Sequence, residues 1–345
     1  MYIMNFINSR DKAAMQTRAV FLPSLKSNTA VPVAALPKIS VAIPTFNRLL
    51  LLQRSLDSVL KQNYPNLEII VSDNASEDGT REFLDRVSDP RVKVLRHQSN
   101  VGMVANWDSC LRVATGTYFL LMSDDDALED SSAIQEFVHA FNGEYGCEVG
   151  IVFSDVLFER SDGIVLETKS GKQTLYNSID LITSVLSNEI SVFPCATVFR
   201  TKDLTDLGGY GVFQATLAVD ACAWMSVALK YGSVARVPKP LSIYRVHQSL
   251  SSSSVEIWSA DYMAMCDVIN LRTTQIPEHK VRSLEKAMLS AWNGVPLGYL
   301  SRRLRYDKDF GILDSLKEIF KYRSRIFTTT NAKLVFQRLL RSMRY

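Results

Sequence analysis

The sequence predicts an α/β protein with a mostly parallel sheet flanked by helices, and three observations predict it. Between residues 38 and 141, strand-like and helix-like segments alternate along the chain. A polar loop follows each of the first four predicted strands. The chain is 345 residues long, which is ample for a buried core and two or three domains. In sheets of this kind ligands bind beyond the carboxyl ends of the strands, so we expect a site where these loops converge.

The first half of the chain supplies the clearest elements, because its apolar residues recur at strand or helix spacing and polar turns separate them. They are, in order, a strand over 39–43, a helix over 49–60, a strand over 67–71, a helix over 80–87, a strand over 92–95, a helix over 104–113, a strand over 118–122 and a helix over 133–141.

Beyond residue 150 the predicted elements are shorter. Strands are predicted over 151–153, 196–200, 233–237 and 241–245, with helices over 178–186 and 221–231. A serine-rich linker follows at 249–254, and the chain then looks helical to its end. We therefore expect a loose leader at 1–37, an α/β domain at 38–250 and a helical, basic C-terminal region at 251–345.

Charge is unevenly distributed behind a net value of +3. Residues 301–345 carry twelve Lys or Arg and four Asp or Glu, a net charge of +8, which leaves −5 (3 − 8) for residues 1–300. Apolar residues at helical spacing accompany these charges, which fits helices lying on an anionic membrane surface or the solvated face of ordinary packed helices. No nucleic-acid-reading motif accompanies the basic residues, so nucleic acid is not an expected partner.

The cysteines and the hydropathy pattern predict the compartment. Five cysteines are scattered singly, as in a reducing environment, with most of them expected to be small core residues. No apolar run approaches the roughly 20 residues of a membrane span, and the N-terminus lacks a secretion-type apolar core. The expected location is cytoplasmic, with peripheral attachment at the inner membrane face as the alternative that the basic region suggests.

Three adjacent carboxylates, Asp124, Asp125 and Asp126, follow the apolar strand at 118–122. Like charges this close repel one another by several kcal/mol each, of the order of 4 at an effective dielectric of about 20. A hard divalent cation with oxygen ligands relieves that repulsion. The alternative is an acidic start to the helix at 133–141, because aspartate is favourable at a helix N-terminus.

The loops together resemble the family 2 glycosyltransferases of the GT-A (Rossmann-like) fold, over roughly residues 38–250. The resemblance is carried by SVAIPTFNR at 40–48, VSDNASEDGT at 71–80, NVG at 100–102, the aspartates at 124–126, LGGY at 207–210 and YRVH at 244–247. It implies an inverting transfer of a hexosyl or deoxyhexosyl group from a nucleotide-diphosphate donor to an acceptor hydroxyl, in cell-surface polysaccharide or glycolipid assembly. A glycan or lipid-linked acceptor is the implied partner.

The resemblance also implies roles for individual residues. The catalytic base would be Asp220, and Mn²⁺ or Mg²⁺ would be held by Asp124, Asp125, Asp126 and His247. The nucleotide sugar would contact a larger set, comprising Pro44, Thr45, Asn47, Arg48, Asp73, Asn100, Gly102, Asp124 and Arg245.

Several alternatives stay open from the sequence. The metal pair is either Asp124 with Asp126, or Asp125 as the main ligand. Asp73 is a base-binding carboxylate or a turn former, and Asp220 is a base or a helix N-cap.

Two positions depart from the family pattern: Val219 replaces the Glu that usually precedes the base, and residues 105–108 lack an expected Arg. The missing Arg leaves the identity of the donor open. A catalytically silent nucleotide-sugar-binding or scaffolding protein, which keeps the fold but lacks a working base, is the second interpretation. A dinucleotide oxidoreductase is set aside, because the glycine fingerprint is missing after the first strand.

Overall fold

The computed structural model describes residues 36–141, 148–160, 163, 165–167, 173–246, 255–270, 278–306, 317 and 321. The strands are β1 (Ile39–Thr45), β2 (Leu67–Asp73), β3 (Val92–Arg96), β4 (Tyr118–Leu121), β5 (Ala127–Leu128), β6 (Ile151–Glu159), β7 (Val165–Glu167), β8 (Leu175–Asn177), β9 (Thr197–Arg200) and β10 (Ser233–Arg245). The helices are α1 (Leu49–Leu60), α2 (Thr80–Asp85), α3 (Met103–Val113), α4 (Ala133–Phe141), α5 (Ser178–Leu186), α6 (Thr201–Leu207), α7 (Val219–Tyr231), α8 (Val255–Asn270) and α9 (Glu278–Tyr306), with a short 3-10 turn, η2, at Pro194–Ala196.

These strands form one sheet in the order β3-β2-β1-β4-β9-β6-β10-β5, with β7 beside β6 and β8 beside β10. Strands β3, β2, β1, β4, β6 and β10 run in one direction, and β9, β5, β7 and β8 run against them. The strand order reverses at β1, which pairs with β2 on one side and β4 on the other. A reversal of this kind leaves an opening beyond the strand ends where ligands bind.

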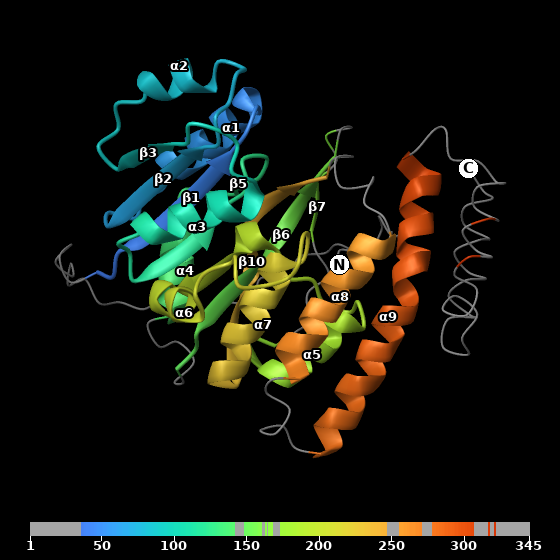
Figure 1. Cartoon of the computed structure of the whole chain (residues 1–345). Coiled ribbons are helices and arrows are strands. Elements are labelled where there is room, and N and C mark those ends of the chain that lie inside the picture. The colour runs from blue at the N-terminus through green and yellow to red at the C-terminus, as the bar shows by residue number, and fades with distance from the viewer. Residues whose placement is uncertain are drawn as a thin grey trace, which may run out of the picture.

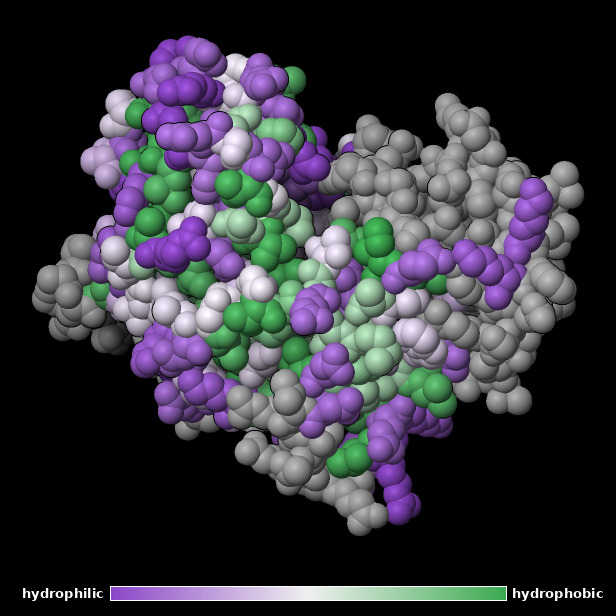
Figure 2. Space-filling model, in the orientation of Figure 1, coloured by the Kyte–Doolittle hydropathy of each residue, from purple (hydrophilic) through white to green (hydrophobic). Residues whose placement is uncertain are grey.

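Apolar side chains on the two faces of the sheet form two separate cores. Alternate residues of one strand point to opposite faces, so Val41 belongs to one core and Ala42 to the other. Helices α1 and α4 cover one face, while α3, α5 and α7 cover the other. Figure 1 shows this layered arrangement, and Figure 2 shows hydrophilic side chains gathered over α2 at the outer edge of the sheet.

Helices α8 and α9 lie side by side against α5 and α7, on the side of α7 away from the sheet (Figure 1). Their buried side chains, among them Trp258, Met265 and Leu284, continue the core that α7 begins. Within the described part of the chain, no helix has both the length and the apolar character that a bilayer crossing needs. Apart from residues 301–306, 317 and 321, the basic segment at 301–345 lies outside the described residues, as does the leader up to residue 35.

The predicted elements of the first half are confirmed, and the helices at 49–60 and 133–141 have the predicted bounds. The two strands predicted at 233–237 and 241–245 are wrong in one respect, because they form the single bulged strand β10. Its pairing with β6 slips around Pro240, which has no N–H to donate to the ladder. The proposed boundary at 250 falls in the segment 247–254 and stays a prediction.

The expectation that most cysteines are core residues is confirmed for the four that the structure describes. Cys110, Cys195, Cys222 and Cys266 are buried and form no disulfide with one another. Burial raises the pKa of the Cys110 and Cys222 thiols to about 12, so neither is a reactive thiolate near neutral pH.

Candidate functional site

The aspartate triplet lies where the carboxyl ends of β1 and β4 meet. These strands run side by side, and Met122 donates its backbone N–H to Ala42 directly before the triplet. The Thr45 hydroxyl donates to Asp124 Oδ2 at 2.7 Å, and Arg48 Nη1 donates to Asp124 Oδ1 at 3.1 Å. Residues predicted from two distant motifs therefore converge on one carboxylate, which is nearly buried.

Asp125 and Asp126 belong to the same cluster but have different partners: Asp125 contacts a charged side chain, and Asp126 accepts a backbone N–H. Arg48 Nη1 lies 3.0 Å from Asp125 Oδ2, so one guanidinium nitrogen contacts two adjacent carboxylates. Asp126 is 3% exposed and accepts the backbone N–H of Arg245 at 3.0 Å. Burial, followed by repulsion from Asp125, raises the pKa of Asp126 well above its usual range. Burial also raises the pKa of Asp124, against the opposing effects of Thr45 and Arg48.

The alternative of an acidic helix start is wrong for this triplet. Helix α4 begins at Ala133, and the carboxylate that shapes its entry is Asp130. Asp130 Oδ1 accepts from the backbone N–H and the hydroxyl of Ser132, both at 2.8 Å. The triplet therefore does not cap α4, and its three carboxylates are buried.

The oxygen ligands of the triplet suit a hard cation. In this structure, however, the carboxylates contact other residues of the chain. Within the described residues, no group of three or more His, Cys, Asp or Glu side chains is arranged as a metal site. Arg48 supplies the positive charge between Asp124 and Asp125 in this structure. Carboxylate oxygens are the ligands that Mg²⁺ and Mn²⁺ prefer, so an ion would find suitable donors there once Arg48 moved. His247, the fourth predicted ligand, lies outside the described residues.

Two loops after β1 and β2 hold each other through their polar atoms. Asn47 donates its backbone N–H to Ser76 Oγ at 2.9 Å and accepts from the Glu77 backbone N–H at 2.8 Å. Asp73, which is buried, accepts the Ser76 N–H at 3.0 Å, so its turn-forming role is present. Asn47 and Ala75 both have positive φ, of 53° and 65°. Such conformations cost about 1–3 kcal/mol in a non-glycine residue and cluster at functional sites.

Side-chain amides connect the β2 loop to the segment before α3. Asn74 donates to Asn100 Oδ1 at 2.9 Å and accepts from the Val101 backbone N–H at 2.9 Å. Asn100 Oδ1 also accepts the Gly102 N–H at 2.8 Å. Gly102 has φ +86° with open space where a Cβ would lie, so the backbone conformation is what requires glycine here. Asn100 is therefore joined to the β2 loop, its ligand contact stays a prediction, and its partner Asn74 was not among the predicted site residues.

Arg245 lies at the end of β10, beside the triplet. Its Nη2 is 3.2 Å from Glu159 Oε2, an oxygen that also accepts from Arg54 of α1. Its Nε is buried and has no hydrogen-bond partner in the described part of the chain. A buried donor without a partner could bond an anionic ligand, and the role predicted for Arg245 toward the nucleotide sugar stays a prediction.

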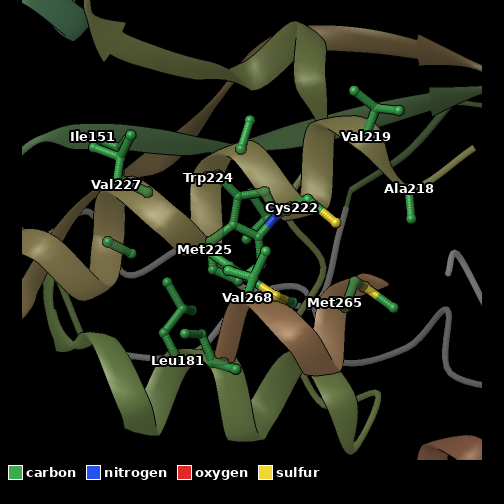
Figure 3. Close-up of a cluster of buried hydrophobic side chains, with 14 of the residues drawn as sticks. Ile151, Leu181, Ala218, Val219, Cys222, Trp224, Met225, Val227, Met265 and Val268 are labelled. Carbon is green, nitrogen blue, oxygen red and sulfur yellow. The ribbon is translucent and has the colours of Figure 1, made fainter. Parts of the chain in front are cut away.

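Asp220 lies in the first turn of α7, and the N-cap position belongs to Ala218, so the interpretation of Asp220 as a helix N-cap is wrong. Asp220 is 8% exposed. It lines a cavity of about 30 Å³ and a smaller one of about 10 Å³. Trp224 lines both cavities, and Figure 3 shows it among the apolar side chains of α5, α7 and α8. The carboxylate is therefore held at the edge of the apolar core.

The segment that lacks the expected Arg has structural contacts instead. Asn106 accepts from the Ser72 hydroxyl at 2.6 Å, and Trp107 packs edge-on against Tyr210 with ring centroids 5.5 Å apart. Asp108 accepts the backbone N–H groups of Tyr210 and Gly211 at 2.7 and 2.9 Å. No sequence signal identified Asp108, because its partners lie about a hundred residues away.

Comparison with known proteins agrees with this arrangement. Residues 40–204 match the model of the family described as Glycosyl transferase family 2. The chain is 34% identical over 140 residues to the GalNAc(5)-diNAcBac-PP-undecaprenol beta-1,3-glucosyltransferase of Campylobacter jejuni, which is 40% of this chain and 43% of that protein. The matched region thus spans less than half of that relative.

Solved structures share the fold at low sequence identity. The structure of S. aureus TarS 1-349 in complex with UDP has a TM-score of 0.60 and 18% identity, covering 84% of this chain and 90% of that one. The mannosyltransferase PcManGT from Pyrobaculum calidifontis, in complex with GDP-Man and Mn²⁺, has a TM-score of 0.54 and 16% identity over 90% of this chain and 87% of that one. The fold is therefore GT-A, and the region at 40–204 is similar to glycosyltransferase family 2.

Proposed function

We propose that the protein is an inverting glycosyltransferase that moves a sugar from a nucleotide-diphosphate donor to an acceptor hydroxyl. The observation that carries the proposal is the convergence of Thr45, Arg48 and the aspartate triplet at the reversal point between β1 and β4. A cluster of buried carboxylates at the edge where α/β sheets bind ligands suits a diphosphate and its metal.

The donor would lie across the loops after β1, β2 and β3. Asp73 and the Asn74–Asn100 pair offer carboxylate and amide groups to a base, and Arg245 offers an unpaired Nε to the diphosphate. The neighbouring TarS and PcManGT structures hold UDP and GDP-Man. The sugar that is transferred is proposed to be a hexosyl or deoxyhexosyl group.

Mn²⁺ or Mg²⁺ would be held by Asp124 and Asp125, with Asp126 and His247 as further candidates. When bound, the ion supplies positive charge that stabilises the departing diphosphate. Arg48 faces the same two carboxylates, so it would have to release them for the ion to bind. The PcManGT structure contains Mn²⁺, which supports this choice of ion.

Asp220 is the proposed base. It would take the proton of the acceptor hydroxyl as that oxygen forms its bond to the anomeric carbon. The bond from the anomeric carbon to the diphosphate oxygen breaks in the same displacement, and the electron pair leaves with the diphosphate. A single displacement on the face opposite the leaving group inverts the anomeric centre.

The acceptor is proposed to be a glycan or a lipid-linked sugar, in polysaccharide or glycolipid assembly at the inner face of the membrane. The Campylobacter relative is named for an undecaprenol-linked acceptor, and the segment at 301–345 has a net charge of +8. Each Lys or Arg that lies close to an anionic membrane surface adds about 1 kcal/mol to membrane binding. Removing 301–345 should abolish binding to vesicles that contain anionic lipid, whereas unchanged binding would contradict membrane attachment.

A panel of nucleotide sugars, tested for hydrolysis with and without Mn²⁺, would identify the donor. Asp220→Asn should then abolish transfer while metal-dependent nucleotide binding persists. Asp180→Asn is a matched control, because Asp180 lies in the first turn of α5 and pairs with Lys280 outside the site. Transfer retained by Asp220→Asn would reject this base, and binding without turnover by the unmodified protein would favour the silent, scaffolding alternative.

A further inference from the structure

The segment at 208–218 joins α6 to α7 and leads directly to Asp220, the second residue of α7. Carboxylates from two other helices hold its ends. Asp108 of α3 accepts the N–H groups of Tyr210 and Gly211, and Asp261 of α8 accepts those of Thr216 and Leu217. The course of the backbone before Asp220 is therefore fixed from outside the segment.

The hold at the first end depends on glycine. A Cβ on Gly209 would lie 2.5 Å from Asp108 Oδ1, and one on Gly211 would lie 2.8 Å from Asp108 Oδ2. Glycine at both positions lets the carboxylate approach the backbone closely enough to accept two N–H groups. This end of the segment is thereby tied to α3 in the glycosyltransferase domain.

The hold at the second end comes from the C-terminal helical region. Asp261 is 1% exposed, and its Oδ1 and Oδ2 lie 2.5 and 2.7 Å from the Thr216 and Leu217 nitrogens. Both carboxylate oxygens are thus committed to backbone donors within a few residues of Asp220. Charge-assisted bonds of this kind are about twice as strong as neutral ones.

Helix α8 also contributes directly to the surroundings of Asp220. Met265 lines the same cavity as Asp220, one turn of helix beyond Asp261. Figure 3 shows Met265 and Val268 of α8 facing the side chains of α7. The pKa of the Cys222 thiol is raised by burial and then by the charges of Asp220 and Asp261, which places both carboxylates near that residue.

We propose that Asp261 is a positioning residue for the base, so that α8 forms part of the catalytic unit. The inference rests on the proposed function of Asp220. Asp261 lies in the C-terminal helical region, outside the residues 40–204 that match the glycosyltransferase family model. The fixed backbone would hold the Asp220 carboxylate in the direction of the acceptor hydroxyl, with little effect on the distant donor loops.

Asp261→Asn tests this directly, because an amide has the same size but only one oxygen to accept a backbone N–H. Transfer should slow by roughly 10- to 100-fold in kcat, since a displacement of about 1 Å costs up to about 10²-fold. The KM for the donor, and the affinities for UDP and GDP measured with Mn²⁺, should stay within twofold. Hydrogen exchange of the Thr216 and Leu217 amides should accelerate, a readout that needs no substrate.

Two controls on the same helix separate positioning from stability. Asp267→Asn removes a charge from an exposed residue of α8, and Val268→Ala weakens the packing of α8. Neither should lower kcat more than threefold at temperatures well below unfolding. If Val268→Ala lowers kcat as much as Asp261→Asn, or if the donor KM rises along with the loss of kcat, the positioning role is rejected.

The proposed function is tested separately by Asp220→Asn in the same assay. Transfer that persists in Asp220→Asn rejects the base itself. Transfer that is lost in Asp220→Asn but unchanged in Asp261→Asn rejects only the positioning role. Faster exchange at 216–217 together with a lower kcat at constant donor KM supports it.

Discussion

Arg48 Nη1 lies 3.1 Å from Asp124 Oδ1 and 3.0 Å from Asp125 Oδ2, so a single guanidinium nitrogen contacts both carboxylates. The Asp124 and Asp125 side chains are 6% and 8% exposed, whereas the Arg48 side chain is 37% exposed. The negative groups are therefore fixed in the fold, and the positive group lies nearer to solvent. We therefore expect Arg48 to leave this position at a smaller cost than either aspartate when a divalent ion is offered.

Arg48→Ala should lower the free energy of unfolding in EDTA by about 1–3 kcal/mol, because two buried carboxylates lose a charged hydrogen-bond partner. Mn²⁺ should then raise the melting temperature of the variant more than that of the unmodified protein, since the ion no longer competes with the guanidinium. Thermal unfolding across a Mn²⁺ titration measures both effects. Arg81→Ala, an exposed arginine of α2, is the matched control. Equal Mn²⁺ shifts in all three proteins would contradict competition.

Asn74→Ala should weaken nucleotide binding by about tenfold and leave the metal-dependent stabilisation unchanged. The substitution removes both the Asn100 contact and the acceptor for the Val101 N–H, so the segment before α3 loses its hold on the β2 loop. Calorimetric titration with UDP or GDP in Mn²⁺ gives the affinity. Asn63→Ala is the control, because Asn63 bonds Ser131 away from the strand ends. An unchanged affinity would place the nucleotide elsewhere.

The sequence predicted the part of the fold that local patterns determine. Helix α1 and helix α4 have the predicted bounds because their apolar residues recur at a regular helical spacing. Strand β10 was predicted as two strands because its prolines resemble a break, whereas pairing with β6 carries the chain through it. The two-residue strand β5 was missed, since its identity comes from pairing with Ile243 and not from its own residues.

In the candidate site, the sequence likewise predicted the residues that follow strand ends but not the long-range contacts. Strand ends placed Thr45, Asp73, Asn100 and the triplet at one edge, because parallel strands terminate together. The contacts of Asp108 and Asp261 were not predictable, since each carboxylate reaches backbone groups that are tens of residues away along the chain. Local sequence patterns carry no record of such pairs, which depend on how α3 and α8 pack.

Acid should destabilise the protein partly through Glu68, a residue of β2 beside β1. Burial opposes ionisation of Glu68, but hydrogen bonds from Ser40 and Thr115 and the charge of Lys38 outweigh it and lower its pKa. A lowered pKa contributes stability above the unfolded value, near 4.3, and this stability is lost as pH falls through the folded value. Urea unfolding from pH 7 to pH 3 should show that Glu68→Gln reduces the free energy of unfolding at neutral pH and flattens its fall in acid. Glu285→Gln, at an exposed position on α9, should retain the full pH dependence, and an equally steep profile for Glu68→Gln would contradict this assignment.

Two ion pairs on β10 allow a comparison of buried and exposed charge on one strand. Arg236 donates to both oxygens of Asp155 at 2.9 and 2.6 Å, and the two side chains are 3% and 5% exposed. Lys239 lies 2.9 Å from Asp130, with both side chains about two-fifths exposed (42% and 36%).

Arg236→Met should lower the free energy of unfolding by about 3–5 kcal/mol, because it leaves the Asp155 charge buried without its partner. Lys239→Met should cost at most about 1 kcal/mol, since solvent screens that pair. Replacing Asp155 and Arg236 together by Leu and Met should recover much of the loss, because no unpaired charge then remains in the core. Urea unfolding of the four proteins measures these differences. An equal loss of free energy of unfolding in Arg236→Met and Lys239→Met would contradict this prediction. The Asp155–Arg236 contact would then contribute no more to stability than a surface ion pair.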